Sequence, residues 1–210
     1  YYYDAEAYVA SKLHLLADHC AVFSREDVER CIERTELEYG MRYAELQRTA
    51  IFEAMRGGVM ILTGGPGTGK TTIIKGLISI FEALDFDVAL AAPTGRAAKR
   101  MSELTGCEAR TLHRLLEVQW DENDRPYFDR NEKNPLDIDT LIVDEVSMVD
   151  LMLMRSLLRA IEPGTRLLLV GDADQLPSVG AGNVLGDILA SGVVPSAGLT
   201  EIFRQDEKSM

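Results

Sequence analysis

The residues best suited to chemistry lie in a glycine-rich segment in the first half of the chain. Gly64, Gly69, Lys70 and Thr71 fit the pattern G-x-x-x-x-G-K-[ST], directly after the apolar run 59–62. In such a loop the glycines let successive backbone N–H groups point at phosphate oxygens, and the following helix adds its positive N-terminal end. The segment therefore predicts binding of a nucleoside triphosphate. The expected contact residues are Gly65, Pro66, Gly67, Thr68, Gly69, Lys70, Thr71 and Thr72.

Four side chains could divide the chemistry of such a site among them. Lys70 can bridge the β- and γ-phosphates, and the Thr71 hydroxyl can ligate Mg²⁺. Two carboxylates, Asp144 and Glu145, directly follow an expected buried strand at 139–143. At a strand end beside the phosphate loop, the first can hold Mg²⁺ through water and the second can polarise an attacking water. Because a kinase needs no base for water, this pair favours hydrolysis.

Three further polar residues are candidates for the same site. Gln175 follows the apolar run 166–170, which places it at the carboxyl edge of the sheet, level with the γ-phosphate. A glutamine there can sense the γ-phosphate by hydrogen bonds. Arg204 could reach a phosphate, although a lone arginine at this position is otherwise solvated. For Gln47, just upstream of the phosphate loop, the residues alone favour a solvated position on a helix.

A basic segment follows an expected strand at 87–92. It begins with Thr94 as the N-cap of a helix and continues with Arg96 and other cations. Loops at the carboxyl ends of parallel strands hold ligand contacts in α/β folds, but the residues alone also fit an ordinary helix start with solvated charges. His113, in the short amphipathic turn 111–116, is by itself more often structural than functional.

Strands and helices alternate along the chain, which predicts a parallel α/β sheet with right-handed crossovers. The first 40 residues indicate a small helical appendage of two helices, the second with a capping-box pattern from Ser24. Residues 117–134 fit either a β-hairpin with an exposed tip or an irregular acidic loop, and we favour the hairpin. Further helices are expected at about 42–56, 148–161 and 184–190, and a last short strand at 199–205.

The composition restricts the class of protein. The 210 residues carry a net charge of −12, which argues against a broad nucleic-acid-binding face but leaves room for a local basic groove. Three cysteines form no disulfide framework, so we expect a reducing compartment, the cytoplasm. We expect no membrane association, because no segment is long and apolar enough to span a bilayer. Since the sequence starts at Tyr1 rather than Met, we expect a fragment of a longer protein.

In this order, the motifs resemble those of the first motor domain of superfamily 1 DNA helicases. The resemblance is to the RecD-like branch, which includes the alpha subunit of exodeoxyribonuclease V and its stand-alone relatives. It runs from about Tyr43 to Gln205. Residues 64–71 resemble motif I, 92–98 resemble motif Ia, and 111–113 resemble the next DNA-contacting segment. Residues 144–145 resemble motif II, 171–180 resemble motif III, and 203–205 resemble the start of motif IV.

The resemblance assigns further roles to residues. It implies ATP and Mg²⁺ as cofactors, with Gln47 as the adenine reader in place of the solvated glutamine favoured above. It makes Gln175 the link between the γ-phosphate and the DNA contacts, and it places Arg204 against the γ-phosphate. Single-stranded DNA contacts are implied for Pro93, Thr94, Gly95, Arg96, Thr111 and His113.

The resemblance also implies a domain organisation and a function. A helical region at 1–40 would precede a RecA-like P-loop NTPase domain at 41–210, with an inserted hairpin at 117–134 that forms a pin thought to part the duplex. The implied activity is an ATP-dependent DNA helicase that moves 5′ to 3′ on single-stranded DNA, or on DNA with a single-stranded tail, in recombination and repair. Subunits of a nuclease complex are possible partners.

The family has a second RecA-like domain that supplies an arginine finger, and this sequence stops before it. We therefore expect the fragment to bind ATP, to hydrolyse it poorly and not to unwind DNA. The residues leave two other functions open. One is a P-loop kinase that phosphorylates a small molecule, and the other is a non-catalytic ATP-dependent clamp or scaffold.

Overall fold

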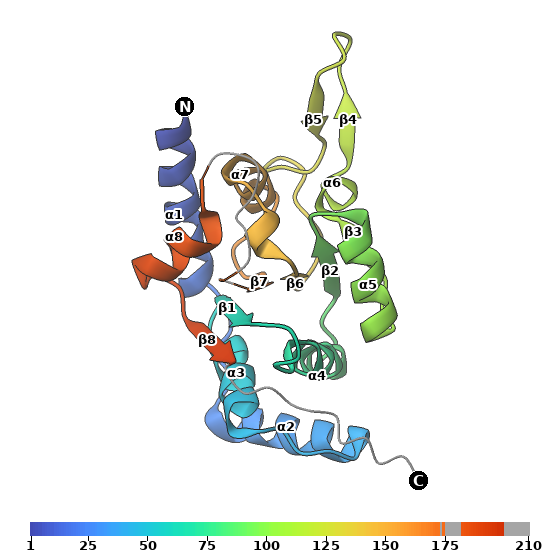
Figure 1. Cartoon of the computed structure of the whole chain (residues 1–210). Coiled ribbons are helices and arrows are strands. Elements are labelled where there is room, and N and C mark those ends of the chain that lie inside the picture. Colours follow the sequence, from blue (N-terminus) through green and yellow to red (C-terminus); the bar gives the residue numbers. More distant parts are fainter. Residues whose placement is uncertain (173, 175–181, 200–210) are drawn as a thin grey trace.

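A parallel β-sheet organises the computed structural model, which describes residues 1–172, 174 and 182–199. Within these residues the sheet has six strands in the order β3-β2-β6-β7-β1-β8, and all neighbouring pairs are parallel (Figure 1). The strands are β1 (Val59–Gly64), β2 (Val88–Ala92), β3 (Ala109–Thr111), β6 (Thr140–Val143), β7 (Arg166–Gly171) and β8 (Ser196–Leu199). The predicted parallel α/β fold is confirmed.

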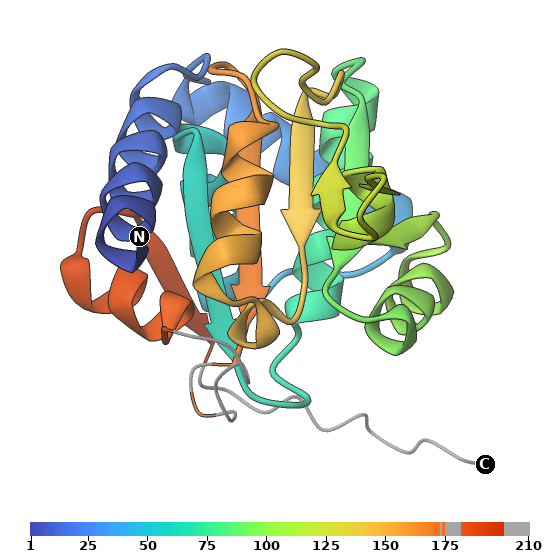
Figure 2. The same ribbon diagram turned by 90° about the horizontal axis from the view of Figure 1, so that it is seen from above.

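Helices cover both faces of the sheet (Figures 1 and 2). On one face lie α1 (Tyr2–Asp18), α6 (Leu112–Leu115), α7 (Leu151–Arg159) and α8 (Val184–Ser191). On the other lie α2 (Arg25–Tyr39), α3 (Glu45–Arg56), α4 (Lys70–Ala83) and α5 (Gly95–Thr105). Successive residues of a strand enter opposite cores; Val59 and Ile61 pack in one, Met60 and Leu62 in the other. Burial on both faces explains why the strands are continuous apolar runs.

The N-terminal helices pack on opposite faces of the sheet rather than forming the appendage that we expected. Val9 and Leu13 of α1 belong to the core on the α7 face, whereas Val28 and Ile32 of α2 belong to the core on the α4 face. The Ser24 side chain accepts a hydrogen bond from the backbone N–H of Asp27, which confirms the predicted N-cap of α2. Each helix has an apolar face that must be buried, and the sheet provides the surface that covers it.

A buried arginine joins the connection between α1 and α2, and the end of α3, to the sheet. Arg166, the first residue of β7, is 4% exposed. Its guanidinium donates to the carbonyls of Met55 (3.0 Å) and Gly57 (2.9 Å) and to that of Ala21. It also lies over the Phe23 ring, 4.9 Å from the centroid. Since Met55 is in the last turn of α3, Arg166 satisfies carbonyls that the helix end leaves open.

Several predicted boundaries were wrong for identifiable reasons. The helix expected at 148–161 is a 3₁₀ turn, η1 (Val146–Met148), followed by α7. Asp150 starts α7 because its side chain accepts from the N–H of Leu153 at 2.8 Å. The helix expected at 42–56 begins at Glu45. Strand β3 was missed, since three residues are too short to show a period.

The region 117–134 contains the expected hairpin. Strands β4 (Val118–Trp120) and β5 (Pro126–Phe128) pair antiparallel and project away from the sheet (Figure 1). The Asp121 carboxylate closes the tip by accepting from the N–H groups of Asn123 and Arg125, at 2.8 and 2.9 Å. A last short strand was expected at 199–205, but β8 (Ser196–Leu199) overlaps this range only at Leu199, and residues 200–205 lie outside the described residues. No helix in the described part of the chain is long and apolar enough to cross a membrane.

Candidate nucleotide-binding site

The glycine-rich segment forms a tight loop between the carboxyl end of β1 and the N-terminus of α4. Gly67 and Gly69 have φ angles of 76° and 87°, which side chains with a Cβ rarely adopt. The Thr68 hydroxyl donates to the Gly65 carbonyl at 2.7 Å, and the Lys70 ammonium donates to the Gly64 carbonyl. No side chain in the described residues caps α4, so the loop presents its first-turn N–H groups to a ligand.

The two predicted carboxylates follow β6, which lies two strands from β1 in the sheet. The Asp144 N–H donates to the Ala91 carbonyl at 2.9 Å, and Asp144 Oδ1 accepts from the Glu145 N–H at 2.8 Å. The first bond holds the backbone beside β2, and the second orients the Asp144 carboxylate. Glu145 has a left-handed backbone (φ 54°, ψ 41°), which is uncommon for a residue with a side chain and concentrates at functional sites.

Burial is the main electrostatic influence on both carboxyl groups. It raises the pKa of Asp144, while the Glu145 amide and the cations Lys70 and Arg100 act in the opposite direction. It also raises the pKa of Glu145, and the neighbouring charge of Asp144 adds to this. A carboxylate with a raised pKa is a stronger base toward water.

The phosphate loop and both carboxylates line one cavity of about 640 Å³, at the carboxyl edge of the sheet. All the predicted nucleotide contacts line it, from Gln47 and 65–72 to the carboxylate pair. Sequence reasoning missed six lining residues outside the matched motifs: Met41, Arg42, Ile74, Arg100, Met101 and Leu104. The charge of Arg100, in the basic segment, was the only signal for any of them.

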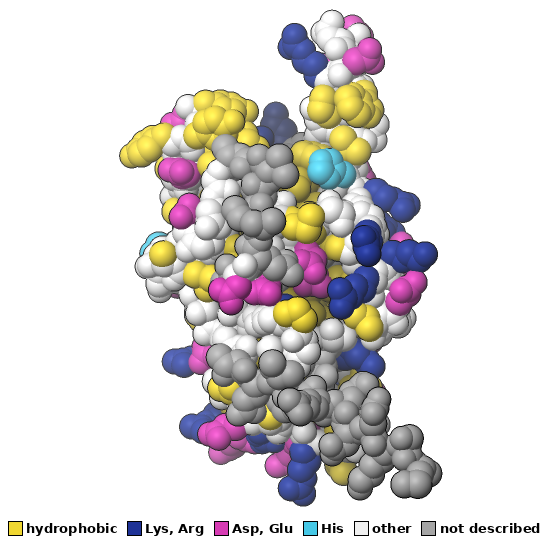
Figure 3. All heavy atoms as spheres, in the orientation of Figure 1, with side chains coloured by type: hydrophobic (Ala, Val, Ile, Leu, Met, Phe, Trp, Pro, Cys, Tyr) yellow, Lys and Arg dark blue, Asp and Glu magenta, His cyan; other side chains and the backbone are white. Residues whose placement is uncertain are grey.

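The donor set of this cavity fits Mg²⁺. The Thr71 hydroxyl and the Asp144 carboxylate both line the cavity, and both are oxygen donors of the kind that Mg²⁺ prefers. Figure 3 shows the face toward which the strands point, with acidic side chains near its middle and basic side chains over α5 beside them. The cations Arg96, Lys99 and Arg100 of α5 are exposed.

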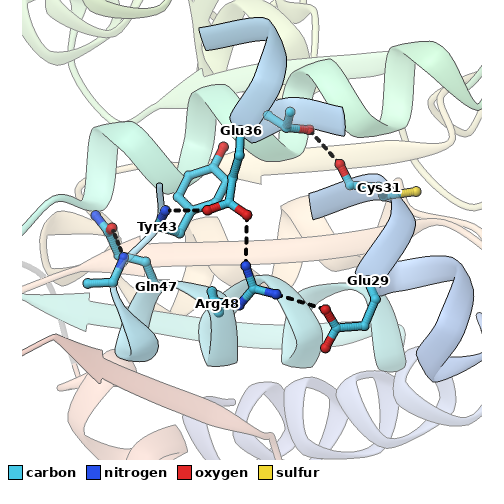
Figure 4. Close-up of polar contacts among 8 residues, drawn as sticks. Glu29, Cys31, Glu36, Tyr43, Gln47 and Arg48 are labelled. Atoms are coloured by element: carbon cyan, nitrogen blue, oxygen red, sulfur yellow. Dashed lines mark hydrogen bonds and ion pairs between the residues drawn. The ribbon is translucent and has the colours of Figure 1, made fainter. Parts of the chain in front are cut away.

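Gln47 is not the solvated glutamine that the residues alone favoured. Its residue is 5% exposed, and its Oε1 accepts from the Ala44 N–H at 2.9 Å (Figure 4). The position at the third residue of α3 explains this, because a glutamine there can close a capping box with the start of the helix. Its place in the lining of the cavity is compatible with the adenine contact implied by the family, which stays a prediction.

The residues expected to contact DNA lie in two loops that are neighbours. Strands β2 and β3 pair in parallel with Ala92 opposite Thr111, so the loops after them share one edge of the sheet. Thr94 is the predicted N-cap of α5, accepting from the Ala97 N–H at 3.1 Å, and Thr111 caps α6 in the same way. Pro93, Gly95 and Arg96 adjoin Thr94 at this edge.

His113 connects the second of these loops to the hairpin. It lies in α6, and its ring packs against Phe128 of β5 with the ring centroids 5.6 Å apart. Two predicted residues, Gln175 and Arg204, lie outside the described residues. The nearby Asp172 is described; it is 8% exposed and accepts from the Asp174 N–H at 3.0 Å.

A family model described as an AAA domain matches residues 47–181. Among proteins with known descriptions, the chain is 47% identical over 151 residues to the ATP-dependent RecD2 DNA helicase of Deinococcus radiodurans, covering 72% of this chain and 20% of that protein. It is 44% identical over 181 residues to the RecBCD enzyme subunit RecD of Mycolicibacterium smegmatis, covering 75% and 32%.

A solved helicase structure has a similar fold. The Pif1 helicase from Candida albicans matches with a TM-score of 0.55 and 25% identity, covering 79% of this chain and 41% of that one. The chain spans only 20% to 32% of the length of the two curated relatives. The family match includes the phosphate loop, the carboxylate pair and the segments after β2 and β3. The chain therefore belongs to the AAA domain family and, over most of its length, is similar to RecD-type DNA helicases.

Proposed function

We propose that this chain is the ATP-binding motor domain of a RecD-like, ATP-dependent DNA helicase. One observation carries the proposal. The phosphate loop and the Asp144–Glu145 pair line a single cavity, at the same edge of the sheet as the loops that follow β2 and β3. A nucleotide site beside a second ligand-binding edge is the arrangement that a DNA-stimulated ATPase requires. The similarity to RecD2 and RecD supports this assignment.

The chain's own groups account for nucleotide binding. The loop N–H groups and Lys70 would hold the β- and γ-phosphates, and Thr71 and Asp144 would hold Mg²⁺. When bound, Mg²⁺ neutralises the charge that develops on the phosphate oxygens. Gln47, which also lines the cavity, would contact the adenine.

Hydrolysis requires a base near the γ-phosphate. We assign this role to Glu145, whose pKa is raised by burial and which lies in the same cavity as Lys70. The Asp144 carboxylate is held by the Glu145 N–H, so the two groups take different positions and different roles. Gln175 and Arg204 would sense and stabilise the γ-phosphate.

DNA would lie across the edge formed by the loops after β2 and β3. The exposed cations Arg96, Lys99 and Arg100 give this part of an acidic chain a local positive charge suited to a phosphate backbone. The hairpin would act as the pin beside it, since Trp120 and Tyr127 are 64% and 50% exposed and could stack on bases. We propose single-stranded DNA as the substrate track, with movement from 5′ to 3′.

The remaining parts of the proposal concern the setting of this domain. A second RecA-like domain would close the cavity and supply an arginine finger, so the chain alone would bind ATP but hydrolyse it poorly. We propose that the protein works in the cytoplasm in recombination and repair, either alone or with subunits of a nuclease complex. The similarity to a RecBCD subunit and to a RecD2 helicase supports both arrangements equally.

The first test is nucleotide binding by this chain. Fluorescent ATP with Mg²⁺ should bind the chain and should bind Lys70→Ala at least about tenfold more weakly, because a charge-assisted contact to phosphate is lost. Lys75→Ala is the matched control, since Lys75 lies on the same helix but points to the Tyr39 ring, 5.7 Å from its centroid. Equal affinity of both variants would contradict the assignment of the phosphate site.

A further inference from the structure

The loop between α2 and α3 borders the nucleotide cavity. Met41 and Arg42 of this loop line the cavity together with Gln47. The loop, residues 40–44, belongs to neither helix, so its backbone groups need partners from outside. The hydrogen bonds to this loop therefore determine how rigidly Met41 and Arg42 are positioned at the cavity.

Glu36 of α2 accepts three of the hydrogen bonds that hold this region, and Figure 4 shows the two that its side chain accepts. The backbone carbonyl of Glu36 accepts from the Met41 N–H at 3.0 Å. Its side-chain Oε2 accepts from the Tyr43 N–H at 2.9 Å, and its Oε1 accepts from Arg48 Nη1 at 2.8 Å. The Glu36 side chain is only 14% exposed, so water competes weakly for these bonds.

Gln47 completes the same arrangement from the α3 side. Its Oε1 accepts from the Ala44 N–H, so two successive loop N–H groups, those of Tyr43 and Ala44, are held by side chains of the flanking helices. The Gln47 amide oxygen is thereby occupied, and its nitrogen points away from the loop (Figure 4). The loop and the Gln47 amide form one hydrogen-bonded unit.

We propose that Glu36 is a positioning residue for the nucleoside end of ATP, acting through the loop 40–44 and Gln47. This inference rests on the proposed function of the cavity. Glu36 lies outside the lining of the cavity, so its effect would be to pre-organise the groups that meet the nucleoside. The phosphate loop, built from β1 and α4, does not depend on Glu36, and binding of the phosphates alone should be insensitive to it.

The chain offers a matched control. Arg48 pairs with two carboxylates of α2, with Glu36 at 2.8 Å and with Glu29 at 2.7 Å. Glu36→Ala and Glu29→Ala each remove one partner of Arg48, but only Glu36→Ala releases the Tyr43 N–H. Affinities of each variant for ATP and for inorganic tripolyphosphate, both with Mg²⁺, separate the nucleoside end from the phosphate end.

We expect Glu36→Ala to bind ATP about tenfold more weakly, with tripolyphosphate binding changed by less than about twofold. Glu29→Ala should change neither affinity by more than about twofold. Glu36→Gln, whose amide oxygen can still accept from the Tyr43 N–H, should restore most of the ATP affinity. Equal losses for both ligands, no loss for either, or the same ATP-specific loss in Glu29→Ala would overturn the inference.

Hydrogen exchange on the unaltered chain tests the inference without any variant. ATP should slow exchange of the amides at 41–44, and tripolyphosphate should not. Equal protection by both ligands would overturn the inference. If the chain binds ATP and tripolyphosphate equally well, the inference fails while the phosphate site stands; if it binds neither, the proposed function fails as well.

Discussion

A methyl group at Gly64 should damage the phosphate loop. A Cβ at this position would lie 2.5 Å from Thr68 Oγ1 and 3.1 Å from Leu199 Cβ. Thr68 is 5% exposed and its hydroxyl donates to the Gly65 carbonyl, so turning it away breaks a buried hydrogen bond. The loss of this hydrogen bond should make the free energy of ATP binding less favourable by about 1–3 kcal/mol, the penalty for a buried acceptor that has lost its donor.

Gly64→Ala should therefore bind ATP roughly tenfold to a hundredfold more weakly than the unaltered chain. Titration calorimetry with Mg²⁺ and ATP measures this, with the melting temperature recorded to show that the variant is folded. Gly198→Ala is the control on the paired strand β8, because among the described residues a Cβ there meets only Thr63 Oγ1, at an ordinary 3.5 Å. If Gly64→Ala bound ATP as well as Gly198→Ala, the reasoning about the loop would be refuted.

Three more predictions concern stability and catalysis. Arg166→Met should lower the free energy of unfolding by about 3 kcal/mol in urea titrations, since one buried and two partly buried carbonyls lose their donor, whereas the exposed Arg56→Met should change it by less than about 0.5 kcal/mol. In the described residues the buried Tyr43 hydroxyl has no hydrogen-bond partner, and burial raises its pKa from 10.0 to about 12. Below pH 10 this pKa difference contributes stability, which is lost as pH rises from 10 toward 12. The free energy of unfolding, measured in urea at pH 10 and at pH 12, should therefore fall less between these pH values in Tyr43→Phe than in the unaltered chain. Glu145→Gln should lower ATP turnover of the full-length protein at least about a hundredfold while ATP binding persists; unchanged turnover would refute the base assignment.

Much of the fold could be predicted because local and tertiary requirements agree. The runs at 59–62, 141–143 and 167–170 are apolar without alternation, as expected for strands of a sheet covered on both faces. The phosphate loop was predictable for a similar reason. Its function restricts the residue types at fixed spacing, so the pattern is visible without knowledge of the rest of the chain.

The missed features depend on contacts that spacing does not encode. Gln47 is buried because the chain folds back at Ala44, and no property of the helix sequence distinguishes it from a solvated glutamine. Met41 and Arg42 line the cavity from a loop whose Met41 and Tyr43 N–H groups donate to Glu36, a contact that sequence spacing does not reveal. The short edge strand β3 exists through its pairing with β2 and has no pattern of its own.

The central claim is that ATP turnover by this site is coupled to DNA. The most direct measurement is ATP hydrolysis by the full-length protein that contains this sequence, with and without single-stranded DNA, beside its Lys70→Ala variant. The proposed function predicts strong stimulation by DNA that disappears in Lys70→Ala. Turnover that DNA does not change would contradict it, and would favour a small-molecule kinase or a nucleotide-dependent clamp instead.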